Sequence, residues 1–127
     1  YVTELDVRFR GLDLMGHVNN AVYASFLEEA RVAYYDEVLG VGVDELGFVL
    51  ARLGIDYERP IQHGDEVRVG LRTTEVGERS MTTEYLIEAG ERTAATAESV
   101  QVAVDEEGKP RSVPEDWRRA IESFEGQ

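Results

Sequence analysis

Residues 9 to 38 read FRGLDLMGHVNNAVYASFLEEARVAYYDEV and contain the longest helical pattern of the chain, together with the loop that leads into it. Apolar side chains recur at steps of three and four residues between Tyr23 and Val38, which is the spacing of a helix of about five turns with one buried face. Asn19 or Asn20 offers a side-chain oxygen that can cap the first amides of this helix. The stretch therefore predicts a glycine-containing loop followed by a long helix.

Strand patterns surround this helix. Residues 1–10 alternate apolar and charged side chains, as a half-buried strand does. Four more strands are predicted at residues 47–58, 66–76, 81–89 and 93–104, followed by a short helix at residues 113–124 that can begin near Pro114. The first of these four is apolar too continuously for a solvated face, so we expect it to be well buried.

This order of elements predicts an α+β fold in which four strands follow the long helix in antiparallel succession. A five-stranded sheet can wrap one apolar helix on its concave face, but its edge strands then stay exposed. Edge-to-edge pairing in a homodimer would protect them, and charged edges would give the same protection in a monomer.

Composition narrows the class of protein. The 127 residues fit one domain, residues 1–127. Lys and Arg total 13 against 26 Asp and Glu, a net charge of −13, so a nucleic-acid partner is not expected. The chain has no cysteine and two histidines, which argues against thiolate chemistry and a metal site. No apolar run suits a membrane span and the first segment does not read as a signal peptide, so the expected localisation is cytoplasmic.

The excess of negative charge also suggests that the stability of the fold depends on salt concentration. Lys109 is the only lysine, and arginine supplies the other cations. Repulsion among uncompensated carboxylates opposes compaction until salt screens it, within about 10 Å at 0.1 M. A halophilic protein from a salt-rich cytoplasm is our interpretation, and an ordinary acidic protein is the alternative.

The loop before the helix carries the residues that point to chemistry. It places the carboxylate of Asp13, the imidazole of His17 and a helix N-terminus within a dozen residues. Free amides at a helix start can polarise a carbonyl oxygen while an acid or base works beside it, which suits acyl transfer. Each of these residues could also have a purely structural role. Asp13 could be an ordinary loop acid and His17 could bind a loop carbonyl. Gly16 could allow a turn with positive φ, and Tyr23 could belong to the core.

The pattern Asp13-x-x-Gly16-x-Val18, followed by Tyr23, resembles the hotdog-fold acyl-CoA thioesterases of the 4-hydroxybenzoyl-CoA thioesterase type. The later Tyr57-x-x-Pro60 also fits, and the resemblance covers nearly the whole chain. It implies a hotdog fold, with the sheet wrapped around a central helix and a short C-terminal helix. It further implies hydrolysis of an acyl-CoA to free acid and CoA without a cofactor, by a homodimer or homotetramer with its site at the dimer interface.

The resemblance also implies roles for single residues. Asp13 would be the nucleophile or the general base, His17 a helper, and the amide near Asn20 the group that binds the thioester oxygen. The substrate-binding residues that it implies are Gly16, Val18, Asn19 and Tyr23. The anionic CoA needs local cations, and Arg59 is our candidate among Arg52, Arg59, Arg68 and Arg72.

Other members of the fold offer alternatives. The loop is also similar to that of acyl-ACP thioesterases, but Met15 stands where those enzymes use an asparagine. Hotdog enoyl-CoA hydratases pair an aspartate with a histidine five residues on, whereas the spacing from Asp13 to His17 is four. A non-catalytic acyl-CoA-binding module is the third possibility.

Overall fold

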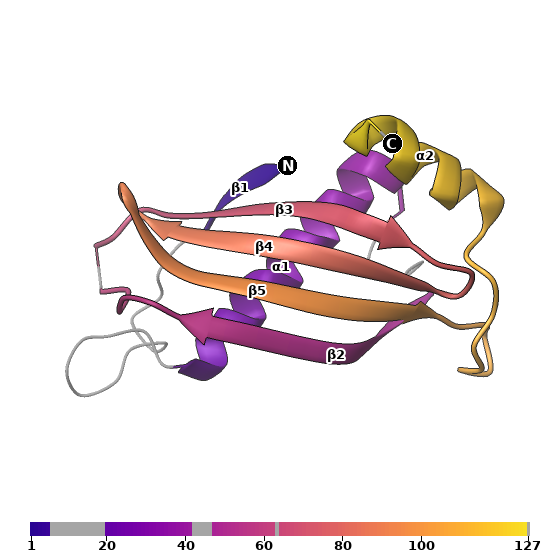
Figure 1. Cartoon of the computed structure of the whole chain (residues 1–127), viewed down its shortest axis with the longest axis horizontal. Coiled ribbons are helices and arrows are strands. Elements are labelled where there is room, and N and C mark those ends of the chain that lie inside the picture. The colour runs from indigo at the N-terminus through magenta and orange to yellow at the C-terminus, as the bar shows by residue number, and fades with distance from the viewer. Residues whose placement is uncertain (6–19, 42–46, 63, 127) are drawn as a thin grey trace.

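A computed structural model describes residues 1–5, 20–41, 47–62 and 64–126. They form one antiparallel sheet with a long helix behind it and a short helix at one corner (Figure 1). The elements are β1 Val2–Leu5, α1 Asn20–Leu39, β2 Phe48–Tyr57, β3 Val67–Val76, β4 Ser80–Ala89, β5 Arg92–Ala103 and α2 Glu115–Glu125. The predicted α+β architecture, with five strands and a long helix, is confirmed.

The order of the strands across the sheet is β1-β3-β4-β5-β2. β3, β4 and β5 follow one another as antiparallel neighbours, as predicted. β2 pairs with β5 rather than with β3, in a register that runs from Phe48 opposite Ala103 to Tyr57 opposite Ala95. The prediction of four strands in direct succession is therefore wrong for β2, because alternation along a strand defines its two faces but not its neighbours.

The core lies between α1 and the inner face of the sheet. Tyr23, Leu27, Ala30 and Tyr34 line the buried side of α1. Alternate residues of the three central strands meet them, and those that are fully buried include Val67, Val69, Met81, Ile87 and Ala95. The expected core role of Tyr23 is confirmed, since its side chain is 2% exposed.

The expectation that β2 is well buried is wrong. Val49 and Leu50 are 49% and 47% exposed, and Leu53 and Ile55 are only partly buried. The physical reason is position: β2 is an edge strand with a neighbour on one side only. Its apolar character therefore marks a surface that this chain leaves largely uncovered.

The C-terminal helix α2 starts after Pro114 and ends at Gly126, whose φ of 75° is the left-handed conformation that favours glycine. Trp117 packs against Phe48 with ring centroids 5.1 Å apart, a contact that anchors this helix. Farther along, the Glu125 carboxylate accepts hydrogen bonds from the Tyr34 hydroxyl at 2.8 Å and from the Thr73 amide at 2.6 Å. α2 is thus tied to both α1 and β3.

Candidate functional site

The first turn of α1 is the part of the predicted site that the structure describes. The helix begins at Asn20, consistent with the start predicted near Asn19 or Asn20, and seven residues after Asp13. The first amides of a helix have no partner within the helix and form the positive end of its dipole. Asp13, Gly16, His17, Val18 and Asn19 lie outside the described residues. The structure therefore places the helix start but not the loop side chains.

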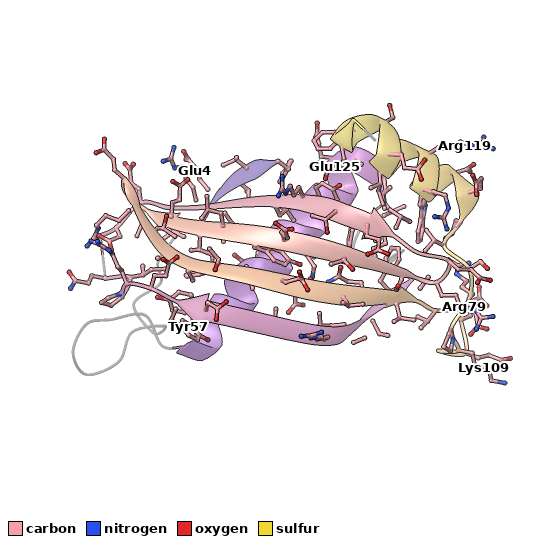
Figure 2. All side chains as sticks on the ribbon, in the orientation of Figure 1. Glu4, Tyr57, Arg79, Lys109, Arg119 and Glu125 are labelled. Atoms are coloured by element: carbon pink, nitrogen blue, oxygen red, sulfur yellow. The ribbon has the colours of Figure 1, made fainter. Side chains whose placement is uncertain are left out.

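Two tyrosines connect α1 to the end of β2. The Tyr23 ring stands almost perpendicular to the Tyr57 ring, at 89° and with centroids 4.9 Å apart. The Tyr23 hydroxyl donates to the Arg59 carbonyl oxygen at 3.4 Å. Burial raises the pKa of Tyr23, so its hydroxyl keeps its proton at neutral pH. Tyr57 is 47% exposed and lies where β2 ends beside the helix start (Figure 2).

The structure separates the four candidate arginines. Arg72 is bound to Glu84 at 3.2 Å, and Arg68 lies 4.0 Å from Glu88. Arg52 and Arg59 are exposed, and neither forms an ion pair within the described part of the chain. Of these two, Arg59 comes two residues after Tyr57, the end of β2 that Tyr23 contacts. It is thus the candidate that lies near the helix start.

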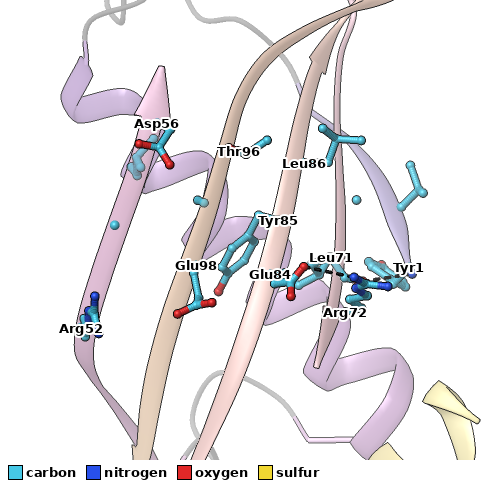
Figure 3. Close-up of a pocket in the computed structure, with 15 residues that line it drawn as sticks. Tyr1, Arg52, Asp56, Leu71, Arg72, Glu84, Tyr85, Leu86, Thr96 and Glu98 are labelled. Atoms are coloured by element: carbon cyan, nitrogen blue, oxygen red, sulfur yellow. Dashed lines mark hydrogen bonds and ion pairs between the residues drawn. The ribbon is translucent and has the colours of Figure 1, made fainter. Parts of the chain in front are cut away.

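A hollow lies on the opposite face of the sheet, away from α1 (Figure 3). Arg72, Glu84, Leu86 and Glu98 project toward this side, and Glu84 stands directly opposite Glu98 in the register. Like charges facing one another across strands disfavour each other, and Arg72 offsets the charge of Glu84. The helix start and Arg59 do not line this hollow.

The sequence analysis missed two residues on the inner side of the sheet. It treats Tyr57 only as part of a motif at the end of a strand, and Arg31 only as one residue of the helix. Arg31 comes four residues after Leu27 and four before Tyr35, so the helical period already placed it on the buried face. In the structure Arg31 is 9% exposed and donates to the Tyr85 hydroxyl at 3.1 Å.

Two further properties concern the described residues. None of the helices in these ranges is both long enough and apolar enough to cross a membrane. The same ranges contain no group of three or more His, Asp or Glu side chains placed to hold a metal ion. Glu28 and Glu29, which follow Leu27 on α1, are exposed.

Residues 7–121 match the family described as the thioesterase-like superfamily. A solved thioesterase from Thermus thermophilus, complexed with coenzyme A and Zn, superposes with a TM-score of 0.93 at 43% identity, covering 99% of this chain and 94% of that one. The long-chain acyl-CoA thioesterase FadM of Escherichia coli is 39% identical over 61 residues, which are 46% of each protein. The Bacillus subtilis protein YsmA is 30% identical over 87 residues, 68% of this chain and 59% of YsmA.

The chain therefore belongs to the thioesterase-like superfamily of hotdog-fold proteins, and the predicted hotdog fold and thioesterase family are confirmed. The matched stretches span about half the length of FadM and somewhat more of YsmA.

Proposed function

We propose that this protein hydrolyses an acyl-CoA thioester to a free carboxylic acid and CoA. The observation that carries the proposal is the start of α1 at Asn20, directly after the stretch of sequence that contains Asp13. The names of the relatives support the substrate class, since FadM is a long-chain acyl-CoA thioesterase and the Thermus thioesterase was solved with coenzyme A.

The first amides of α1, near Asn20, would hold the thioester oxygen and stabilise the negative charge that develops on it. As a general base, the Asp13 carboxylate would take a proton from the water that attacks the carbonyl carbon. As a nucleophile, it would form an anhydride that water then cleaves. In both routes the carbon–sulfur bond breaks and the thiolate of CoA leaves and is protonated. His17 would orient Asp13 or the water, and Gly16, Val18 and Asn19 would shape the loop around the acyl group.

Arg59 would bind a phosphate of CoA. It is exposed, free of ion pairs within the described residues and adjacent to the helix start, and a protein of net charge −13 needs local cations to hold an anionic ligand. Tyr23 helps to hold the backbone of Arg59 in this position, because its buried hydroxyl donates a hydrogen bond to the Arg59 carbonyl oxygen. Tyr57 adds an exposed aromatic surface at the same place.

A second copy of this chain would complete the site by covering β2. Leu50 pairs with buried Gln101 and Tyr57 pairs with buried Ala95, so both face the inner side of the sheet, yet each is 47% exposed. The outer edge of β2 also has no neighbouring strand within the described residues. Pairing of two β2 edges would cover the apolar surface and satisfy the free backbone groups. The proposed assembly is a homodimer, or a tetramer built from two dimers.

The acidic surface fits a halophilic protein of the cytoplasm. Glu84 and Glu88 are paired with arginines on the sheet surface, but 26 acidic against 13 basic residues leave a large excess of negative charge. We expect the denaturation midpoint to rise between low ionic strength and molar KCl. An unchanged midpoint would favour the ordinary acidic protein.

The decisive experiment measures release of CoA thiol from short, long and aromatic acyl-CoAs in molar KCl, for the wild type beside Asp13→Asn. A carboxylate base contributes roughly 10² to 10⁴ in rate, so kcat should fall by that order in the variant. Asp56→Asn is the matched control, because Asp56 is exposed on the opposite face of the sheet. Full activity of Asp13→Asn would refute the mechanism. A folded wild type without turnover would refute hydrolysis, and crotonyl-CoA hydration and ligand binding would then separate the hydratase from the binding module.

A further inference from the structure

A cluster of polar side chains is buried between α1 and the sheet. Its members are Arg31 and Tyr35 from α1, Thr83 and Tyr85 from β4, and Ser99 and Gln101 from β5. The hydroxyls of Tyr85 and Ser99 share a hydrogen bond of 2.5 Å. The Gln101 amide donates to Ser99 and its oxygen accepts from Thr83 at 3.1 Å. The sheet side of the cluster is thus closed by its own hydrogen bonds.

The helix side of the cluster has unused hydrogen-bonding capacity. Arg31 carries five N–H donors, and its hydrogen bond in the described structure goes to Tyr85. No carboxylate of the described residues forms an ion pair with it. The Tyr35 hydroxyl is buried and has no partner within the same residues. A buried charge without a counter-charge and an unsatisfied hydroxyl are both costly, so such groups call for a ligand or a function.

An apolar path leads from the helix start to this cluster along the inner face of β2. Tyr57, Ile55 and Leu53 follow one another on this face, opposite Ala95, Ala97 and Ser99 of β5. Ile55, Leu53 and Ala97 are only partly buried, and they pack against the core beside this path. From Tyr57 to Leu53 it measures about 13 Å at roughly 3.3 Å per residue. It ends at Ser99, whose hydroxyl is bound to Tyr85 and, through it, to Arg31.

We propose that Arg31 and the Tyr35 hydroxyl determine specificity for an acyl group whose far end carries an oxygen acceptor, with a carboxylate as the best fit. This inference rests on the proposed function, because it assigns the path along β2 to the acyl chain. A carboxylate at the end of a medium-length chain would accept from the free N–H groups of Arg31 and from Tyr35. A plain alkyl end would leave both groups unsatisfied, and sites of this kind discriminate strongly against ligands that lack the partner.

The first test measures binding without chemistry. Non-hydrolysable S-alkyl thioether analogues of CoA, with chains of six, eight and ten carbons ending in either methyl or carboxylate, are titrated calorimetrically into the wild-type protein. We expect the carboxylate series to bind at least tenfold more tightly at its best length. Arg31→Met and Tyr35→Phe should reduce this preference, whereas Arg52→Met, on the opposite face, should retain it. Equal or weaker binding of the carboxylate series by the wild type would overturn the inference.

The second test uses the thioesters themselves. Arg31→Met should lower kcat/KM at least tenfold for acyl-CoAs with a terminal carboxylate, mainly through KM, and should change it less than twofold for the methyl-ended series. Arg31→Lys, which keeps the charge, should restore part of the preference and guards against a folding defect in Arg31→Met. An acyl-CoA that ends in a hydroxyl is included in the same series. Comparing it with the carboxylate-ended acyl-CoAs shows whether the site prefers an anion or accepts any oxygen acceptor.

The two tests distinguish a failure of the proposed hydrolysis from a failure of the proposed specificity. If no thioester is hydrolysed but the carboxylate analogues bind preferentially through Arg31, the proposed hydrolysis is wrong and the specificity stands. If hydrolysis is found but Arg31→Met leaves the ratio of the two series unchanged, the specificity is wrong. The same unchanged ratio with a weakened dimer would assign Arg31 to a carboxylate of a second copy instead.

Discussion

The ring of Tyr23 stands at 89° to the ring of Tyr57, with the two centroids 4.9 Å apart, and this contact joins the first turns of α1 to the last residue of β2. Because Tyr23 is buried and Tyr57 is half-exposed, the pair links the core to the surface beside the helix start. The hydrogen bond from Tyr23 to the Arg59 carbonyl extends the link to the proposed CoA-binding arginine.

Replacing Arg59 by alanine should weaken CoA binding. Loss of a hydrogen bond to a charged phosphate costs about 1.5 kcal/mol, so KM for acyl-CoA should rise about tenfold while kcat stays nearly constant. The effect should shrink as KCl is raised, because salt screens an exposed charge. Steady-state kinetics at two salt concentrations measure both effects. Arg72→Ala, which removes an arginine paired on the other face, is the control, and an equal rise in KM for both variants would contradict the assignment.

Glu125→Gln should loosen α2. The carboxylate accepts one hydrogen bond from the Thr73 amide and one from the Tyr34 hydroxyl, and the neutral amide weakens both. We expect a loss of about 1 to 2 kcal/mol in the free energy of unfolding, measured by urea denaturation. Glu122→Gln, three residues earlier on the same helix, should change stability by less than about 0.5 kcal/mol. Similar losses in both variants would mean that Glu125 does not hold the helix through these bonds.

Tyr35→Phe should make the ligand-free protein more stable. The variant removes a buried hydroxyl that has no partner among the described residues and keeps the ring, which stacks on Phe48 at 5.4 Å. The expected gain is about 1 kcal/mol, the lower end of the cost of an unsatisfied buried group. Thermal and urea unfolding at neutral pH measure it. A clear loss of stability would show that the hydroxyl is satisfied in solution.

Stability should fall at alkaline pH. Burial is the main reason that the pKa values of both Tyr34 and Tyr35 lie above the ordinary value of 10.0. Below that value the folded and unfolded states hold the same phenolic protons, so stability is complete. Above it the unfolded state loses these protons first, which lowers the free energy of unfolding by about 1.4 kcal/mol per pH unit for each tyrosine. Urea midpoints from pH 9 to 11 test this, and a shallower slope is expected in Tyr35→Phe.

Leu50→Lys should separate the proposed dimer. Leu50 lies on the inner side of the edge strand β2 and is 47% exposed, so a charge there costs little in the single chain but disfavours burial against a second copy. Light scattering after size exclusion should show a smaller species than the wild type, with unchanged far-UV circular dichroism. Ser123→Lys, on the exposed surface of α2, is the control. A monomeric wild type would refute the dimer outright.

The sequence by itself determined the local structure and the family. The three- and four-residue spacing after Asn20 predicted α1, and the alternation of Val67, Val69 and Leu71 predicted a half-buried strand that the structure confirms. Such periods are properties of neighbouring residues, so they can be recognised before any fold is known. The loop motif around Asp13 identified the thioesterase resemblance for the same reason.

Only the tertiary structure decided which elements meet. The apolar run of β2 suggested a well-buried strand, but its pairing with β5 alone makes it an edge. The helical period puts Arg31 on the buried face of α1, but only the packing of the whole chain places it against Tyr85. Tyr57 and Arg59 became neighbours of the helix start through Tyr23, more than thirty residues away in sequence. These contacts join distant segments, and strand order and helix placement depend on the free energy of the whole packed chain rather than on any local pattern.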